Sequence, residues 1–502
     1  MNSLLLASGT AILGTALGGG ALAIIRSTRS FKTAVALDFT AWTLLILPSF
    51  ILAQGWILFS SGKGIANQLF GITWVTDFIF QPFGLIMIMT LCKFSYTYLA
   101  VNAALEWNVK RYGEAARLCG ATNWTSFWTI HAPPLLLPAF LSGGALIFMD
   151  TIGDFGLPAS LAAVYNFPTL PYSIYTALYT APIRFDMAGV LSLYLVGIII
   201  IAMGIQLWIL KKGKFNFLNE RAERTIAKKS RFSWIFTAIN IIFLAVALGI
   251  PVGSNLIVSF MKTMGNGISF GNFTLANYQE LFQLNSTMLE GFLHSLQIAL
   301  VAGIFGLIIG FLIGYVLIYT DFRLSPLVDS LSIISLAVPG VVLGIGYIFV
   351  WNQPWLQFFN LQLYGTPWIL LLASIASAIP IVTRLMISAM IKIPSSLLSS
   401  AALQGASLSK RMITILAPLM KASLITAGLT AFGTSIFDLA ISTILYPPNF
   451  ITLPVAINRA FDDLNYGYAT AATIMSGTFI VLFMMMIRCS IEKMLNVRFL
   501  KQ

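Results

Sequence analysis

The sequence predicts an all-α polytopic membrane protein, with about eleven transmembrane helices arranged as two repeats of the same orientation. Three observations lead to this fold class: the composition, a series of long apolar segments, and a polar motif that occurs twice. Of the 502 residues, 58% are hydrophobic and 9% are charged, whereas soluble domains are about 45–50% apolar and about 25% charged. The chain is therefore too apolar to fold as a soluble domain.

The charge balance and the few reactive residues exclude several classes of protein. Lys and Arg number 29 against 17 Asp and Glu, which gives a net charge of +12. In a membrane protein this excess belongs to cytoplasmic loops, so we expect no nucleic-acid partner. The 3 cysteines stand far apart and the 2 histidines form no cluster, so we expect neither a metal site nor a cofactor. No nucleophile–base pair is apparent, and we expect no enzymatic activity.

Each apolar segment that is long enough to cross the hydrocarbon core marks an expected helix. Such a helix needs about 20 mostly apolar residues, whereas a cleaved signal peptide has a basic segment before its apolar stretch. Here the first positive charge, Arg26, follows the first apolar stretch, so we expect a retained helix. The expected spans are 3–25, 34–59, 78–104, 134–151, 187–210, 233–258, 293–319, 326–350, 367–390, 419–440 and 467–488.

The basic segments fall on one side of this map and predict its orientation. They are 26–32, 211–231, the two polar loops 105–133 and 391–418, and the C-terminal tail. Because Lys and Arg are enriched on cytoplasmic loops, all of these segments and the C-terminus are expected in the cytoplasm. An odd number of spans then places the N-terminus outside. Either the first repeat lacks one helix, or the start codon lies further upstream.

The chain is duplicated around two similar polar segments. Residues 114–136 read "EAARLCGATNWTSFWTIHAPPLL" and residues 399–421 read "SSAALQGASLSKRMITILAPLMK", with the glycine, the isoleucine and the Ala-Pro in matching places. The match extends into the flanking apolar segments, which is typical of an internal repeat. Further matching pairs are Ser3 and Ser295, Pro48 and Pro339, and Asp154 and Asp438.

The repeat predicts how the two halves are organised. Matching spans are separated by an even number of spans, so the halves share one orientation and are related by an axis along the membrane normal. We expect a first half at 1–210 with five spans and a second half at 233–502 with six. The basic segment 211–232 is the expected cytoplasmic linker between them.

Each polar loop is expected to form a short helix, a bend and a second short helix on the cytoplasmic face. Gly120 and Gly405 interrupt helix-forming sequence, and glycine accepts the left-handed conformation that ends a helix. A following Thr, Asn or Ser can cap the next helix. Pro133 and Pro418 suit the first turn of the membrane helix that follows. Two such loops at matching positions favour paired docking elements over plain surface helices.

The first polar loop resembles the EAA loop of type I ABC importer permeases, whose pattern is Glu-Ala-Ala-x3-Gly-x9-Ile-x-Leu-Pro. Ala132 replaces the Leu of this pattern in the first loop, and Ala417 replaces it in the second. In the second loop Ser399 stands where Glu is expected and Ser400 replaces the first Ala. The matching residues are Glu114, Ala115, Ala116, Gly120, Ile130 and Pro133 in the first loop, and Ala401, Gly405, Ile415 and Pro418 in the second.

The resemblance covers nearly the whole chain and implies the type I ABC importer fold, with two permease halves fused in one chain. It implies that each loop is a coupling helix seated on a subunit of a cytoplasmic ATPase dimer, and that an extracytoplasmic binding protein delivers the substrate. The location would be the bacterial cytoplasmic membrane. Because Glu114 offers a carboxylate where Ser399 offers a hydroxyl, ATPase attachment is expected to depend more on Glu114.

Two further segments resemble one group within this family. "MDTIGDFG" at 149–156 and "STILYPPNFITLP" at 442–454 are similar to the ferric-iron permeases and their thiamine and polyamine relatives. Ferric iron is therefore the expected cargo, while thiamine, polyamines and phosphonates stay open. An ATP-independent secondary transporter is the alternative from another class. Such proteins hold paired intramembrane charges, and paired docking loops would have no purpose in them.

Charged residues inside spans are candidates for function because burying a charge in the membrane is costly. Asp38, Lys93 and Arg384 lie within expected spans, and Lys93 lies deepest. Asp154 and Asp438 align across the repeat near the outer ends of matching spans. With Lys93 they are the candidates for a substrate pathway or its external mouth. The alternative for the two aspartates is that each caps the start of a helix.

Overall fold

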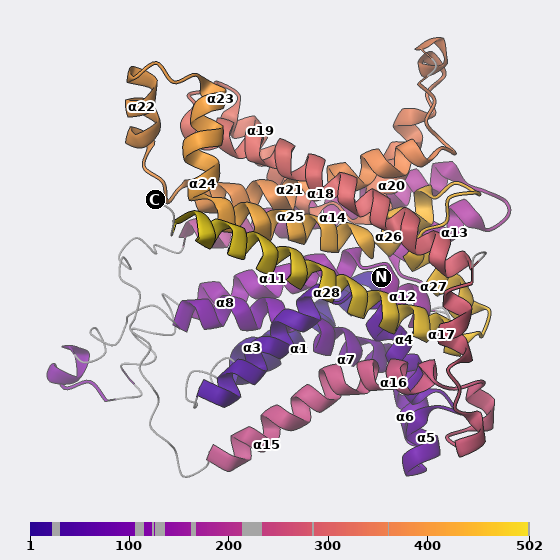
Figure 1. Cartoon of the computed structure of the whole chain (residues 1–502). Helices are drawn as coiled ribbons and strands as arrows, with labels where there is room; N and C mark the ends of the chain where they lie inside the picture. The colour runs from indigo at the N-terminus through magenta and orange to yellow at the C-terminus, as the bar shows by residue number, and fades with distance from the viewer. Residues whose placement is uncertain are drawn as a thin grey trace. The chain divides into compact units, whose positions relative to one another are not determined.

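The computed structural model describes residues 1–22, 31–105, 115–122, 125, 136–161, 167–212, 233–283, 286–359 and 361–499. These ranges are helical, apart from turns and one isolated antiparallel bridge between Met261 and Phe273 (Figure 1). The prediction of an all-α protein is confirmed for them.

The chain divides into two compact units. The first unit comprises Met1–Ile257 and Met264–Phe270, and the second comprises Val258–Thr263 and Gly271–Gln502. The first unit contains α1 (Asn2–Gly14), α3 (Phe31–Ile46), α4 (Ser49–Ser60), α5 (Ile65–Phe70), α6 (Trp74–Ile79), α7 (Pro82–Lys93), α8 (Ser95–Leu105), α11 (Leu137–Gly153), α12 (Gly156–Leu161), α13 (Leu170–Tyr179), α14 (Phe185–Lys212) and α15 (Ser233–Leu244).

Helix α16 (Ile250–Ser259) runs across the boundary between the two units in sequence. The second unit contains α17 (Ala276–Leu281), α18 (Thr287–Tyr319), α19 (Ser325–Ala337), α20 (Gly340–Trp351), α21 (Pro367–Met390), α22 (Ser395–Leu403), α23 (Leu408–Arg411), α24 (Ala417–Leu419), α25 (Lys421–Ile436), α26 (Leu439–Leu445), α27 (Leu453–Asp462) and α28 (Tyr466–Phe499).

A helix or a bent pair of helices lies at each of the eleven expected spans. Within the described ranges, 6 helices are long and apolar enough to cross a membrane, and the number rises to 9 if each bent pair is one span. The other two positions hold the shorter apolar helices Asn2–Gly18 and Leu137–Gly153. The chain is therefore a multi-pass membrane protein, while the count of eleven crossings stays a prediction.

Sharp bends at proline-containing segments divide the expected spans 34–59 and 326–350, and the prediction of one continuous helix was wrong there. The expected span 34–59 is broken between α3 and α4 by a bend of 108°, and 326–350 is broken between α19 and α20 by a bend of 114°. Pro48 and Pro339 stand at these breaks in an extended conformation. Proline lacks the N–H that a continuous helix needs, and it disfavours the helical conformation in the residue before it.

The duplication is visible in the contacts within each unit. In the first unit, the buried Ser3 hydroxyl accepts a hydrogen bond from the Leu170 N–H at 2.6 Å. In the second unit, the matching Ser295 hydroxyl accepts one from the Leu453 N–H at 2.9 Å. The helices that follow the breaks also pack alike, because α4 contacts α12 and α20 contacts α26. Matching sequences therefore build matching local structure.

Part of the segment after the expected linker packs on the first unit. A Cβ at Gly55 would lie 2.2 Å from the carbonyl oxygen of Pro251, so only glycine allows this close approach. Asn255 Nδ2 donates a hydrogen bond to the Ile51 carbonyl at 3.1 Å, and Ala247 belongs to the core of the first unit. The first compact unit thus includes residues that the sequence repeat assigns to the second half.

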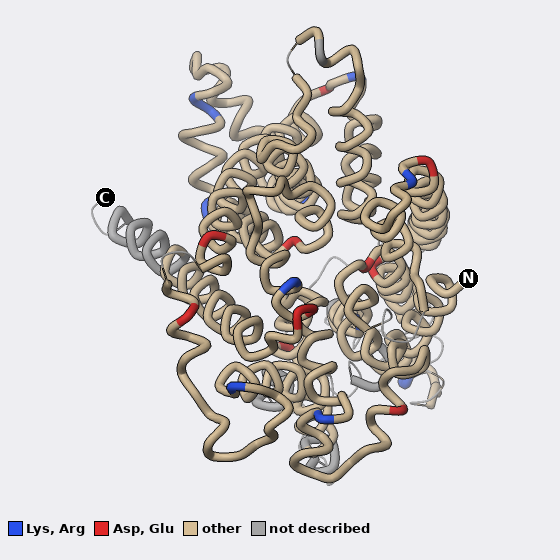
Figure 2. The backbone as a smooth tube through the Cα atoms, turned by 90° about the vertical axis from the view of Figure 1, so that its right-hand side faces the viewer, with Lys and Arg blue, Asp and Glu red and all other residues tan. Residues whose placement is uncertain are grey.

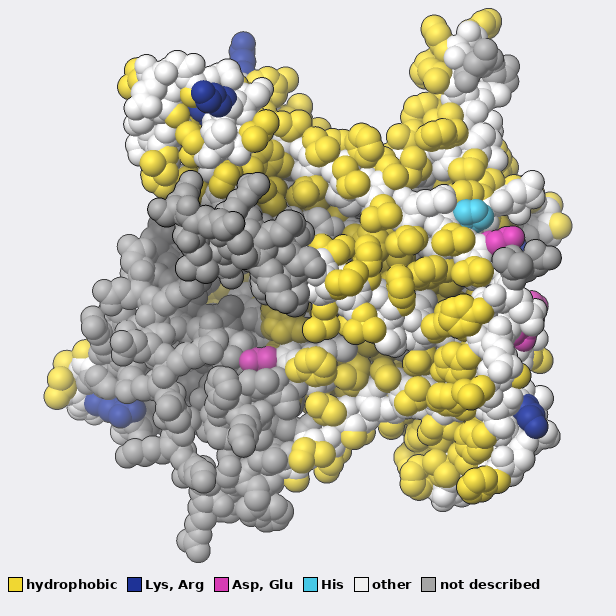
Figure 3. Space-filling model, viewed as in Figure 1, with side chains coloured by type: hydrophobic (Ala, Val, Ile, Leu, Met, Phe, Trp, Pro, Cys, Tyr) yellow, Lys and Arg dark blue, Asp and Glu magenta, His cyan; other side chains and the backbone are white. Residues whose placement is uncertain are grey.

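The long helix α28 has an apolar surface. Figure 3 shows hydrophobic side chains along the described part of this helix and basic side chains at α23. A large apolar surface on so long a helix is what contact with lipid requires. The exposed apolar side chains of α28 include Phe479, Val481, Leu482, Met485 and Met486.

Candidate functional site

The second polar loop forms the expected helix, bend and second helix. Helix α22 ends at Leu403, and Gly405, just beyond its end, has φ +83. The Gly405 N–H donates to the Ala402 carbonyl at 2.9 Å and the Ala406 N–H donates to the Ala401 carbonyl at 3.0 Å. This pair of bonds is a Schellman motif, in which glycine ends the helix. The Ser407 hydroxyl then caps α23 by accepting from the Lys410 N–H at 3.4 Å, as the sequence predicted.

The first polar loop repeats this geometry in the residues that are described. Gly120 has φ +90, its N–H donates to the Arg117 carbonyl at 2.9 Å, and the Ala121 N–H donates to the Ala116 carbonyl at 3.0 Å. Thr122, which matches Ser407, accepts from the Thr125 N–H at 3.2 Å. Ala115 is exposed at the start of this turn. Glu114, Ile130 and Pro133 lie outside the described residues.

Each polar loop presents an almost fully exposed leucine at the same position. Leu118 is 91% exposed and Leu403 is 90% exposed, and each stands two residues before the glycine of its bend. A leucine on a polar loop gains nothing from such exposure unless a partner covers it. Sequence reasoning missed both residues, although an apolar residue at matching places in two polar segments was a usable signal.

The second polar loop is anchored to the helices of its own unit. The Tyr319 hydroxyl donates to the carbonyls of Met390 and Ile393, at 2.8 and 3.1 Å, and thereby holds the end of α21 against α18. Leu398 is buried, and Ile415 packs half-buried on the same core cluster. A movement of this loop would therefore displace α18 and α21.

The remaining residues of the second loop are placed as follows. Ser399 is exposed and its hydroxyl donates to the Ser395 carbonyl of its own helix at 3.2 Å, while Ala401 is half-buried. Pro418 lies in α24, and the membrane helix α25 begins only at Lys421. The expectation that Pro418 occupies the first turn of the membrane helix was therefore wrong. A bend of 87° after Leu419 separates α24 from α25.

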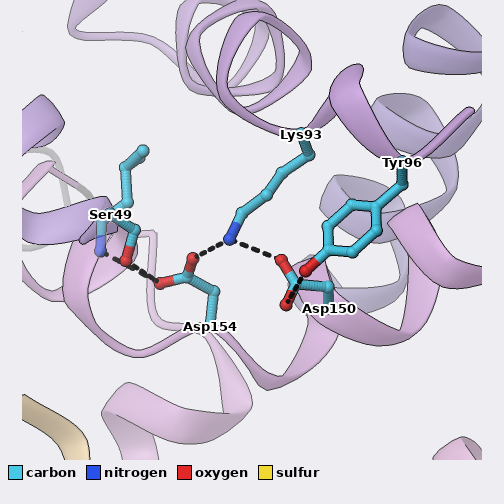
Figure 4. A network of polar contacts seen from close by, with 6 residues as sticks. Ser49, Lys93, Tyr96, Asp150 and Asp154 are labelled. Atoms are coloured by element: carbon cyan, nitrogen blue, oxygen red, sulfur yellow. Dashed lines mark hydrogen bonds and ion pairs between the residues drawn. The ribbon is translucent and has the colours of Figure 1, made fainter. Parts of the chain in front are cut away.

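A network of ion pairs lies among the helices of the first unit (Figure 4). The Lys93 ammonium lies 2.5 Å from Asp150 Oδ2 and 2.7 Å from Asp154 Oδ2. The Tyr96 hydroxyl donates to Asp150 Oδ1 at 3.0 Å, and the Ser49 hydroxyl donates to Asp154 Oδ1 at 2.8 Å. The sequence singled out Lys93 and Asp154 separately, and the structure brings them together.

The network joins elements that are far apart in sequence. Asp154 follows α11, and its Oδ1 also accepts from the Leu157 N–H at 3.2 Å, so that it caps α12. Through Ser49 it holds the start of α4, and through Lys93 it holds the end of α7. The side chains of Lys93 and Asp154 are only 15% and 5% exposed, and such buried charges are tolerable only when they are paired. Figure 2 shows how sparsely charged residues occur along the described helices.

Asp438 occupies the matching place in the second unit but has different neighbours. Its Oδ1 accepts from the Ile441 N–H at 2.9 Å and caps α26, as Asp154 caps α12. Gly340 and Thr434 stand where the first unit has Ser49 and Asp150. No ion pair of Asp438 occurs among the residues whose positions are given. Both aspartates therefore cap helices, while a shared role at an external mouth stays a hypothesis.

Comparison with known proteins identifies the family. Residues 304–495 match the family described as binding-protein-dependent transport system inner membrane component. The chain is also 30% identical to the molybdenum transport system permease protein ModB of Escherichia coli, over 31% of this chain and 68% of that protein. The chain belongs to this family. It is a type I ABC importer permease in which two permease halves are fused.

Two ferric transport permeases align with this permease over most of its length. It is 24% identical to the ferric transport system permease protein FbpB of Actinobacillus pleuropneumoniae, over 97% of this chain and 69% of that protein. It is 25% identical to the putative ferric transport system permease protein FbpB 1 of Haemophilus influenzae, over 86% of this chain and 67% of that protein. The alignments thus cover about two thirds of the length of these relatives.

Proposed function

We propose that this permease is the membrane subunit of an ATP-driven importer, which receives its substrate from an extracytoplasmic binding protein and releases it into the cytoplasm. The two polar loops carry the proposal, because both have one backbone geometry and both expose a leucine at the same position. Two equivalent loops suit the two subunits of an ATPase dimer. ATP hydrolysis then takes place on that dimer and favours one state of the permease through both loops.

Ferric iron is the proposed cargo. The support is the resemblance of two sequence segments to ferric-iron permeases, together with the names of two relatives that align over most of the chain. A relative named for molybdenum transport also aligns, over a smaller part of the chain. Thiamine, polyamines and phosphonates stay as alternatives, because specificity in this arrangement rests largely on the binding protein.

The proposed arrangement has eleven spans in the cytoplasmic membrane of a bacterium, with the C-terminus in the cytoplasm. Residues 1–210 and 233–502 form two halves of parallel orientation, joined by the cytoplasmic linker 211–232. The matching bonds of Ser3 and Ser295 support the duplication. The distribution of Lys and Arg supports the orientation.

Reconstitution tests the function and the cargo together. Proteoliposomes that contain the permease, with the ATPase and binding protein encoded by neighbouring genes, should accumulate radioactive ferric ion only with ATP. The double variant Leu118→Asp, Leu403→Asp should abolish ATPase attachment and uptake, because it places a charge where each docking surface is apolar. The matched control is Leu397→Asp, since Leu397 is an exposed leucine of α22 without a counterpart in the described first loop.

Three results of this experiment would count against the proposal. Uptake that needs no ATPase would favour a secondary transporter. Normal attachment of the ATPase to the double variant would show that the loops are not the docking elements. ATP-dependent uptake of thiamine, a polyamine or a phosphonate, without uptake of ferric ion, would show that the proposed cargo is wrong and that the proposed mechanism is right.

The orientation is tested with a native cysteine of the first polar loop. Cys119 is free and exposed, and it lies next to Leu118. In a Cys489→Ala background, an impermeant thiol reagent should leave Cys119 unlabelled in intact cells, but should label a cysteine introduced at the exposed Gly265. In inside-out vesicles Cys119 should react, and added ATPase should protect it. Labelling of Cys119 in intact cells would reverse the topology.

A further inference from the structure

Asp38 in the first unit and Asp329 in the second lie within expected spans, at the same place in the repeat. Asp38 precedes Pro48 by as many residues as Asp329 precedes Pro339, so each aspartate lies on the helix before the break. In the first unit, the buried Tyr98 hydroxyl donates to Asp38 Oδ1 at 2.8 Å.

In the second unit the partner of the aspartate is a cation. Arg384 Nη2 donates to Asp329 Oδ1 at 2.7 Å and to the Asp329 carbonyl at 3.1 Å. Each unit thus has a contact, called a tie below, between this aspartate and a polar side chain. A phenol makes it in the first unit, and a guanidinium makes it in the second.

Both partners lie on the helix that precedes a polar loop. Tyr98 lies on α8, and the next part of the chain that the structure describes is the first polar loop. Arg384 lies on α21, which ends at Met390, immediately before the second polar loop. At about 1.5 Å of rise per residue, both side chains start about 10 Å from the loop end of their helices. The two ties therefore occupy equivalent depths.

The tie in the second unit joins a loosely packed helix to a firmly packed one. Helix α19 has no buried residue, whereas α21 has many, Met386 and Met390 among them. The 114° bend leads from α19 into α20, which packs against α26. The side chains of Arg384 and Asp329 are 28% and 46% exposed, and a charge-assisted hydrogen bond is shorter and stronger than one between neutral groups. The Arg384–Asp329 contact is therefore well placed to make α19 follow any movement of α21.

We propose that Asp38–Tyr98 and Asp329–Arg384 are positioning contacts through which each polar loop moves the broken helix of its own half. This inference rests on the proposed function, because it requires the loops to receive movement from an ATPase. Both contacts are charge-assisted because each ends on a carboxylate, and the Arg384 guanidinium adds a full positive charge that the Tyr98 hydroxyl lacks.

The test compares three variants in the reconstituted complex: Arg384→Gln, Asp329→Asn and Tyr98→Phe. All three should retain the ATPase and hydrolyse ATP, because none lies in a polar loop. Substrate imported per ATP should fall roughly 5–150-fold for the first two variants, the range usual for coupling between distant sites. Tyr98→Phe removes one hydroxyl and keeps the ring contact with Phe94, so its loss should be smaller.

A charge exchange and a matched control show whether the contact passes movement between the helices or only stabilises the fold. The exchange Asp329→Arg with Arg384→Asp should restore import per ATP. Ser330→Ala should change nothing, because the Ser330 hydroxyl donates to the Pro326 carbonyl of its own helix. Melting temperatures are measured for every variant. Normal import per ATP in Arg384→Gln and Asp329→Asn overturns the inference, and so does a loss that follows melting temperature and is not rescued. Failure of the unmodified complex to couple ATP to import instead overturns the proposed function.

Discussion

Replacing Lys93 by methionine should be among the most damaging single substitutions in the first unit. It leaves Asp150 and Asp154, whose side chains are 34% and 5% exposed, without the ammonium that lies 2.5 and 2.7 Å from them. Removing one partner of a buried ion pair costs about 3–5 kcal/mol because the remaining charge is uncompensated. The expected result is a steep loss of folded permease, measured as the monodisperse fraction in detergent and as the melting temperature.

A neutral version of the network is the control for this prediction. Lys93→Met combined with Asp150→Asn and Asp154→Asn removes every charge, and replacing a whole buried ionic group by neutral residues is often tolerated. The triple variant should therefore recover most of the folded protein. If Lys93→Met alone is as stable as the unmodified chain, the network does not hold the first unit together.

The second large effect is expected at the bends of the two polar loops. Gly120 and Gly405 have φ +90 and +83, a region that costs other L-residues about 1–2 kcal/mol and β-branched residues more. A Cβ at either position would meet no atom within 4 Å, so the cost is conformational and involves no clash. Gly120→Val and Gly405→Val should each redirect the following helix and abolish attachment of the ATPase, measured by co-purification at matched expression.

Asparagine distinguishes the backbone requirement from a need for glycine itself. Asparagine often occupies the left-handed position that ends a helix, so Gly405→Asn should keep most of the ATPase attachment that Gly405→Val loses. Equal and mild effects of valine at both positions would mean that the loops do not pass movement to the membrane helices. A severe effect of Gly405→Asn would instead point to direct contact between this glycine and the partner.

The family of this protein could be predicted from short segments of its sequence. Glycine, small residues and the Ala-Pro at matching places indicated two copies of one loop, and the structure gives both copies the same Schellman bonds and the same type of cap. The helix positions were predictable too, because a run of apolar residues must satisfy its backbone polar groups internally in lipid. These properties depend on residues close in sequence.

The sequence by itself thus determined the all-α membrane fold, the duplication and the geometry of the loop bends. Only the tertiary structure decided which charges meet. Lys93 lies far in sequence from Asp150 and Asp154, and nothing local distinguishes Tyr98 or Arg384 as partners of Asp38 and Asp329. The proline breaks were visible at Pro48 and Pro339, but their angles of 108° and 114° were not. The physical reason is that such contacts arise when helices pack against one another. Packing brings together residues that are far apart in sequence, and no single segment determines which residues will meet.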